Sequence, residues 1–188
     1  MGGHAALGAA SAWVTRFAPL IPPGDVLDLA CGSGRHARLL AQQGHPVLAV
    51  DRDEQALAAC AAPGITCERQ DLEGGAPWPY PGCRFAGIIV TNYLHRPLFP
   101  ALFNALAPGG VLIYVTFGAG NGLYGKPSSA DFLLQPGELL EQVRRHGPTM
   151  RIVAYEDGYL GQPRPAMVQR LCAVMHLPES DPARSLAL

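Results

Sequence analysis

The stretch Asp28-Leu29-Ala30-Cys31-Gly32-Ser33-Gly34 decides how this chain folds. It completes an apolar run that starts at Val26, which is typical of a buried strand. Glycines 32 and 34 allow a tight turn and let a ligand lie against the backbone. The amphipathic stretch 35–43 follows and predicts a helix whose free N–H groups point into the same space.

Apolar runs and short amphipathic stretches alternate over most of the chain. Strands are predicted at 26–30, 47–50, 65–68, 85–91 and 111–117. Helices are predicted at 35–43, after an N-cap at Asp53, along Phe99, Leu102, Phe103 and Leu106, and from Pro136 to Gly147. This alternation predicts a parallel sheet with right-handed crossovers and helices on both faces.

The pattern changes near the C-terminus, where 150–155 and 166–175 are strand-like with no helix between them. The Gly- and Pro-rich loop 157–165 joins them, which predicts an antiparallel hairpin. We expect one domain, 1–188, with an N-terminal helical lid at 1–20 and a loose tail at 177–188. On the N-terminal helix, Trp13 and Phe17 lie four residues apart and fit either core packing or a lid over a ligand.

Composition excludes several classes of protein. The chain is 48% hydrophobic and 15% charged with a net charge of −1, so it is globular and has no charge surplus for nucleic acid. No apolar run approaches the roughly 18–20 residues of a membrane span, and residues 1–6 do not resemble a signal peptide. The five cysteines form no Cys-x-x-Cys pair, so we expect no metal site, reduced thiols and a cytoplasmic location.

Polar residues follow the predicted strands, at the edge where open sheets of this type bind ligands. Asp51 can accept hydrogen bonds from both hydroxyls of a ribose, and Arg52 can lie over an adenine face. Asp71 and the backbone N–H of Leu72 can bind the polar edge of adenine. Asp28 can orient the loop that follows it or bind an ammonium group through water.

Residues 26–34 resemble the first motif of class I S-adenosylmethionine-dependent methyltransferases, and the resemblance covers about 12–175. Asp51, Asp71-Leu72 and Thr91 fall where that family's later motifs fall. The run Gly34-Arg35-His36, with the residues after it as far as Asp51, is similar to the family's tellurite-resistance branch. The resemblance implies an α/β, Rossmann-like fold with strand order 3-2-1-4-5-7-6 and an antiparallel C-terminal hairpin.

The resemblance also implies a cofactor, S-adenosylmethionine, with S-adenosylhomocysteine as the product. The expected cofactor residues are Asp28, Ala30, Gly32, Ser33, Gly34, Asp51, Arg52, Asp71, Leu72 and Thr91, with Arg16 near the methionine carboxylate. Ala30 stands where the family's commonest motif has glycine. The Asn-Pro-Pro-Tyr/Phe signature of enzymes that methylate amino groups of nucleic acids is absent after Asn92, which argues against adenine N6 as the acceptor.

The loops 92–99 and 120–127 resemble a bacterial subgroup close to that branch, and we expect the methyl acceptor there. Candidate acceptor residues are Arg96, Asn121, Tyr124, Lys126 and Trp13. His95 is the candidate general base, with Tyr93 as a second catalytic candidate. We expect a small-molecule acceptor such as a thiol or a metalloid oxyanion, for which Arg96 and Lys126 can hold the negative charge.

Two alternatives remain open on sequence grounds. Residues 32–37 also satisfy the loose dinucleotide pattern Gly-x-Gly-x-x-Gly/Ala, so an NAD(P)-binding protein is the enzymatic rival. A non-catalytic protein that binds S-adenosylmethionine is the other. The sequence predicts neither a membrane nor a nucleic-acid partner, and it fits a monomer or a homodimer.

Overall fold

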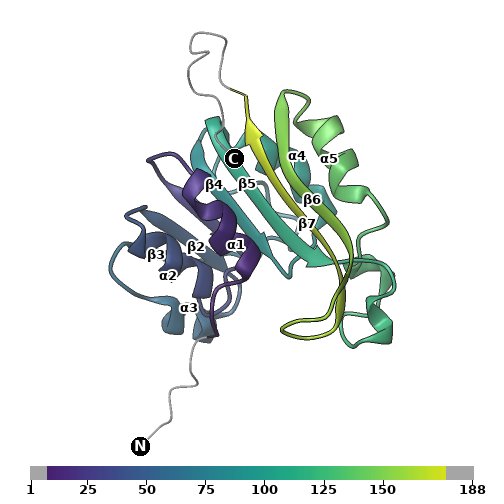
Figure 1. Ribbon diagram of the computed structural model, residues 1–188. Helices are drawn as coiled ribbons and strands as arrows, with labels where there is room; N and C mark the ends of the chain where they lie inside the picture. The colour runs from purple at the N-terminus through teal and green to yellow at the C-terminus, as the bar shows by residue number, and fades with distance from the viewer. Residues whose placement is uncertain (1–7, 177–188) are drawn as a thin grey trace, which may run out of the picture.

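The computed structural model describes residues 8–176 and is built on a seven-stranded sheet of order β3-β2-β1-β4-β5-β7-β6 (Figure 1). Strands β1 to β5 run parallel, and β7 is antiparallel to both β5 and β6. The predicted strand order and C-terminal hairpin are therefore confirmed. The strands are β1 (Val26–Leu29), β2 (Val47–Asp51), β3 (Ile65–Arg69), β4 (Phe85–Thr91), β5 (Leu106–Phe117), β6 (Met150–Leu160) and β7 (Ala166–Met175).

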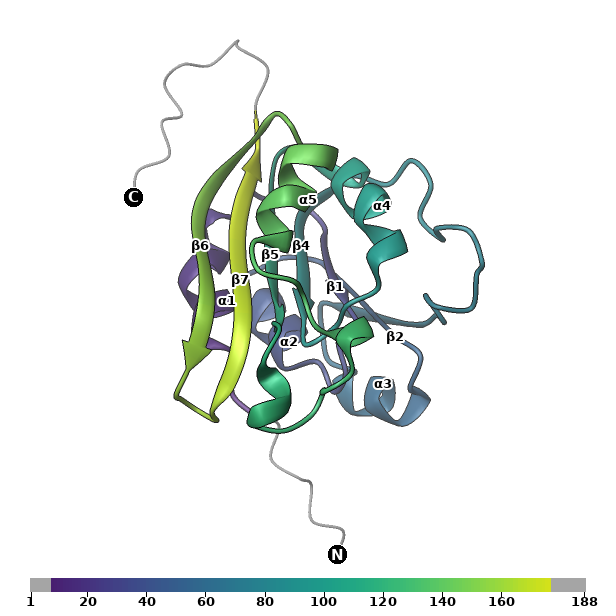
Figure 2. The ribbon, with the colours of Figure 1, turned by 90° about the vertical axis from the view of Figure 1, so that its right-hand side faces the viewer.

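Helices cover both faces of the sheet, as Figures 1 and 2 show. The helices are α1 (Ala12–Phe17), α2 (Arg35–Gln42), α3 (Glu54–Cys60), α4 (Phe99–Asn104) and α5 (Glu138–His146), with short 3-10 helices η1 (Ala18–Leu20), η2 (Arg96–Leu98), η3 (Asn121–Leu123) and η4 (Ala130–Phe132). Side chains of α1, α2 and α3 share one hydrophobic cluster, and those of α4 and α5 share the other. The sheet thus separates two cores.

The central strands are apolar because they are buried on both faces. In β4, Phe85 to Val90 are all buried, as the continuous apolar run predicts. All residues of β1 are buried as well, and the one polar residue among them is Asp28. Each buried aliphatic side chain stabilises the fold by about 1.5–3 kcal/mol. A buried carboxylate in the same strand instead lowers the stability of the fold.

Two predicted elements have different bounds. Leu106 was predicted on the fourth helix, but that helix ends at Asn104 and Leu106 begins β5, opposite Phe85. A leucine that must be buried satisfies a helical and a strand pattern equally well. The first hairpin strand extends to Leu160, because the Asp157-Gly158 pair that resembled a turn is paired with Gln169 and Val168 of β7.

The N-terminal helix packs as core in its described part, which is one of the two roles that the sequence allows. Trp13 and Phe17 are buried, and the indole N–H of Trp13 donates to the Leu171 carbonyl of β7 at 3.3 Å. Residues 1–7 and the predicted tail 177–188 lie outside the described residues. Within residues 8–176, no helix is long and apolar enough to cross a bilayer.

Candidate functional site

A pocket of about 240 Å³ opens at the carboxyl ends of strands β1 to β4. Ligands of open parallel sheets bind at this edge. The lining residues are Ala30, Asp51, Arg52, Gln70, Asp71, Leu72, Glu73, Asn92 and Tyr93. The structure therefore brings together residues from all four strand ends that the sequence singles out, and its charged side chains are three acidic ones and one basic one.

Asp51 is held in a fixed orientation at the centre of this pocket. Its Oδ2 accepts a hydrogen bond from the Gly32 backbone N–H at 2.8 Å, and its Oδ1 accepts one from Asp53 N–H at 2.9 Å. Each carboxylate oxygen can accept a further bond. Because a backbone N–H group holds each oxygen in place, the carboxylate is preorganised to bind two neighbouring hydroxyls.

Asp28 lies beneath the loop that carries Gly32. Its side chain is fully buried, and neither carboxylate oxygen has a hydrogen-bond partner. Burial, and then the charge of the nearby Cys60, raises the pKa of Asp28 to about 7. An unpaired buried carboxyl is costly to the fold, so Asp28 remains a candidate for a role with a ligand although it does not itself line the pocket.

Backbone strain is concentrated in the same pocket. Among the described residues, the non-glycine residues with positive φ are Ala30 at 52° and Asn92 at 55°. Both line the pocket. Left-handed conformations cost non-glycine residues of the order of 1 kcal/mol and persist mainly at functional sites. The strain therefore supports the assignment of this pocket as the functional site.

Replacing Ala30 with glycine is expected to raise the Tm by roughly 2–4 °C, because glycine adopts positive φ without a Cβ penalty of about 1 kcal/mol. Thermal unfolding followed by circular dichroism measures the change. Ala37→Gly is the matched control, since Ala37 is buried inside α2 and its replacement should lower the Tm. A fall in Tm for Ala30→Gly would show that the Ala30 methyl group is needed for packing.

His36 connects three elements around the site, and its role was not predicted. Ser11 N–H donates to His36 Nε2 at 3.2 Å, so Nδ1 carries the proton and donates to Thr91 Oγ1 at 3.2 Å. Burial, and then the charge of Arg35, lowers the pKa of His36 to about 4, so the ring is neutral at physiological pH. The buried imidazole fixes the start of α1 against the end of β4.

Residues 26–110 match the family model described as a methyltransferase domain. The matched range is a little under half of the chain. Trans-aconitate 2-methyltransferase from Delftia acidovorans is 38% identical over 103 residues, which cover 50% of this chain and 38% of that protein. The enzyme of the same name from Variovorax paradoxus is 36% identical over 101 residues, covering 50% of this chain and 39% of that protein. The chain thus matches less than half the length of these relatives.

Solved structures share the fold of this chain. TehB from Haemophilus influenzae superimposes with a TM-score of 0.68 at 20% identity, covering 88% of this chain and 62% of that one. An S-adenosylmethionine-dependent methyltransferase from Methanosarcina mazei gives 0.65 at 14% identity, covering 90% and 100%. The predicted Rossmann-like methyltransferase fold is confirmed. At these identities, the likeness shows the fold alone.

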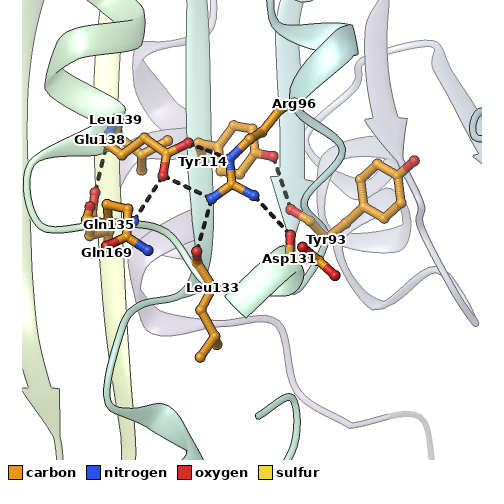
Figure 3. Close-up of polar contacts among 9 residues, drawn as sticks. All are labelled: Tyr93, Arg96, Tyr114, Asp131, Leu133, Gln135, Glu138, Leu139 and Gln169. Atoms are coloured by element: carbon orange, nitrogen blue, oxygen red, sulfur yellow. Dashed lines mark hydrogen bonds and ion pairs between the residues drawn. The ribbon is translucent and has the colours of Figure 1, made fainter. Parts of the chain in front are cut away.

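The Arg96 side chain is bound to residues 131–138 and is not free to bind an anion (Figure 3). Its guanidinium pairs with both carboxylate oxygens of Glu138, at 2.8 and 3.0 Å, and donates to the carbonyls of Asp131 and Leu133. The predicted role as an acceptor anchor therefore needs correction. Its partners come from a segment 35–42 residues further along the chain, which sequence patterns do not reveal.

The predicted acceptor residues after β5 divide into two groups. Asn121 is buried, donates to the Pro127 carbonyl and accepts from Met167 N–H, so it shapes the loop and does not face an acceptor. Tyr124 and Lys126 are exposed on the same loop. The Tyr124 ring lies 5.2 Å from that of Tyr159 at the tip of the hairpin. These side chains remain candidates for contact with a second substrate.

Tyr93 and His95 occupy different places after β4. Tyr93 lines the pocket with a buried, unpartnered hydroxyl, and burial followed by the Glu73 carboxylate raises its pKa. A phenol that stays protonated is a hydrogen-bond donor and a poor base, so the catalytic prediction for Tyr93 becomes a ligand-binding one. His95 is half-buried outside the pocket lining, at the start of η2.

Several other predicted residues lie apart from the pocket lining. Arg16 stacks on Phe17, with its guanidinium 4.9 Å from the ring centre, and Trp13 packs on the sheet. Ser33 is exposed on the loop. The Thr91 hydroxyl bonds to the buried His36 ring. The sequence prediction missed Gln70, Glu73 and Asn92, although each adjoins a residue that it had singled out.

Proposed function

We propose that the chain binds S-adenosylmethionine in the pocket at the ends of β1 to β4 and transfers its methyl group to a small molecule. The observation that carries the proposal is the oriented Asp51 carboxylate in an acidic pocket at the carboxyl end of β1, the strand that contains the buried Asp28. A carboxylate that can accept from two hydroxyls suits a ribose, and the acidic surroundings suit a positively charged ligand.

The residues present fit this cofactor on two independent grounds. A Cβ on Gly32, where φ is +54°, would meet no atom within 4 Å, so the loop leaves open space against its backbone. Within residues 8–176, Asp28 supplies a buried carboxyl whose oxygens have no hydrogen-bond partner. Asp51 would suit the ribose of a dinucleotide as well, but the carboxyls of Asp28 and Asp71 disfavour its pyrophosphate.

Three parts of the cofactor have proposed partners among these residues. Asp51 holds the ribose hydroxyls, Asp71 and the Leu72 amide hold the adenine edge, and Asp28 attracts the amino group. When bound, S-adenosylmethionine supplies a methyl group already activated on a positively charged sulfur. The chain's own residues then mainly align the acceptor and exclude water. We propose His95 as the base wherever the acceptor must lose a proton.

For the acceptor, we propose a small anionic molecule. Two relatives carry the name trans-aconitate 2-methyltransferase, and trans-aconitate is a small organic anion. Lys126 is exposed at the loop after β5 and makes no ion pair within residues 8–176. With Arg96 bound to Glu138, Lys126 is the stronger candidate for the residue that holds the acceptor's charge.

Replacing Asp51 with asparagine is expected to weaken S-adenosylhomocysteine binding by about 10- to 100-fold, because charge-assisted hydrogen bonds contribute about 1.5–3 kcal/mol. Isothermal titration calorimetry measures the change. Glu54→Gln removes an exposed carboxylate nearby, on α3, and should leave the affinity unchanged. Equal affinities for Asp51→Asn and the native protein would place the ribose elsewhere.

Activity is tested by incubating the protein with isotope-labelled S-adenosylmethionine and a panel of carboxylic acids, thiols and metalloid oxyanions. Mass spectrometry then detects methylated products. We expect a labelled product from an anionic small molecule, with a higher KM in Lys126→Ala and a partial recovery in Lys126→Arg. Cofactor binding without transfer to any member of a broad panel would instead favour a non-catalytic binding protein.

A further inference from the structure

Strands β1 and β4 pair side by side at the centre of the sheet, but their carboxyl ends separate. On β1 the pairing with β4 stops at Leu29. The chain then turns toward β2, where the Cys31 N–H donates to the Val50 carbonyl at 3.0 Å. After β4 the chain turns the other way, because the Asn92 N–H donates to the Val115 carbonyl of β5 at 2.8 Å. The sheet therefore opens between the ends of β1 and β4.

Ala30 and Asn92 lie at this opening, where both line the pocket and both have positive φ. The helices that follow them cover opposite faces of the sheet. Leu40 of α2 is buried in one hydrophobic cluster, and Phe99 of α4 is buried in the other. Open parallel sheets bind ligands where neighbouring strands diverge in this way. The opening between β1 and β4 is therefore a place where a ligand can contact both strand ends.

Asn92 brings free polar groups to this opening. Its side chain is exposed, and its amide makes no hydrogen bond with any residue in the range 8–176. Its backbone is held on both sides, by its own bond to β5 and by the next residue. The Tyr93 carbonyl accepts a hydrogen bond from the buried Tyr114 hydroxyl at 2.9 Å (Figure 3). A fixed backbone that presents an unbonded amide to a pocket is preorganised to bind a ligand.

The positive φ of Asn92 restricts which side chains fit this position. Glycine adopts this conformation freely, and asparagine and aspartate adopt it more readily than other residues. Glycine has no side chain, and aspartate would add a fourth carboxylate to a pocket that contains Asp51, Asp71 and Glu73. Asparagine differs from both because its amide carries two N–H donors. Asn92 therefore supplies an uncharged hydrogen-bond donor beside three carboxylates.

We propose that Asn92 binds the methyl acceptor, with its amide N–H donating to a carboxylate or other oxyanion oxygen of that molecule. The inference rests on the proposed function, which puts adenine at the end of β3 and the ribose at the end of β2. The strand order continues from β2 to β1 and β4, so the methyl-bearing end of the cofactor falls at the opening. An anionic acceptor that enters there is repelled by the carboxylates and needs a donor to hold it.

Two substitutions at one position test the proposal. Asn92→Gly removes the amide and relieves the strained φ, so its Tm should be no lower than that of the native protein. Asn92→Asp keeps the shape of the side chain and replaces the N–H donors with a carboxylate. Transfer from labelled S-adenosylmethionine to carboxylic acids, with trans-aconitate among them, gives kcat and KM. We expect kcat/KM to fall at least about tenfold in Asn92→Gly and further in Asn92→Asp.

The order of the two variants separates binding from shape. A residue that only shapes the loop would tolerate Asn92→Asp better than Asn92→Gly, which is the reverse of the expected order. Isothermal titration should give affinities for S-adenosylhomocysteine within about twofold of the native value for Asn92→Gly. Gln70→Ala is the matched control, because it removes another uncharged amide of the pocket at the far end, after β3. It should leave the KM of the acceptor unchanged.

The possible results separate this inference from the proposed function. A native kcat/KM in either Asn92 variant would overturn the inference and leave the proposed function intact. Binding of S-adenosylhomocysteine without transfer to any anionic acceptor would overturn the inference as well. A native protein that does not bind S-adenosylhomocysteine would contradict the proposed function itself, and the role of Asn92 would fall with it.

Discussion

Replacing Asp28 with asparagine is expected to stabilise the protein at pH 8 and, at the same time, to weaken S-adenosylhomocysteine binding at least about tenfold. In the folded state the pKa of Asp28 is raised from 3.8 to about 7. A raised pKa favours the folded state at low pH, and this stabilisation is lost as the pH rises from about 4 through 7. Above pH 7 the ionised, unpaired carboxylate costs on the order of 3 kcal/mol, which corresponds to roughly 5–10 °C in Tm.

Melting curves of both proteins between pH 5 and pH 8 test the stability. The Tm difference should grow across this interval and level off above pH 7. Affinity of the native protein for S-adenosylhomocysteine should rise over the same range as Asp28 ionises, whereas Asp28→Asn should show a flatter profile. Asp25→Asn is the control, because Asp25 is exposed just before the other end of β1. A lower Tm for Asp28→Asn at pH 8 would mean that the carboxylate stabilises the native loop.

Replacing Arg96 with alanine is expected to destabilise the protein by about 2–3 kcal/mol, or roughly 5–10 °C in Tm. The Glu138 side chain is 11% exposed, so losing its partner leaves a nearly buried carboxylate unpaired. The carbonyls of Asp131 and Leu133 lose their donors as well. Hydrogen exchange should therefore increase across 130–138, while affinity for S-adenosylhomocysteine changes by less than about twofold.

The double variant Arg96→Ala/Glu138→Gln separates a structural role from an anion-binding one. Removing the stranded charge should restore part of the lost stability, so the double variant should be more stable than Arg96→Ala alone. Arg145→Ala breaks an exposed pair with Glu141 and should cost only about 0.3 kcal/mol. If Arg96→Ala kept the native Tm and instead raised KM for the acceptor, Arg96 would be an acceptor anchor after all.

The cofactor edge could be predicted from the sequence because its chemistry is local. Asp51 and Asp71 each end or follow an apolar run, and parallel strands bring their carboxyl ends to one edge. Alternation of strands and helices predicts this edge without any long-range information. The same logic could have included Asn92, since it follows β4 directly and its positive φ suits asparagine.

Other roles depend on contacts that sequence patterns do not contain. The sequence predicts a free cation at Arg96, but the fold pairs it with Glu138. It predicts an acceptor residue at Asn121, but that side chain bonds to the Met167 backbone N–H. Both contacts join segments more than 40 residues apart.

Isothermal titration of the reduced protein with S-adenosylhomocysteine and, separately, with NAD⁺ tests whether the pocket at the ends of β1 to β4 holds S-adenosylmethionine. We expect one-to-one binding of S-adenosylhomocysteine that Asp51→Asn weakens, and no measurable binding of NAD⁺. Binding of NAD⁺ without binding of S-adenosylhomocysteine would show that the pocket serves a dinucleotide instead.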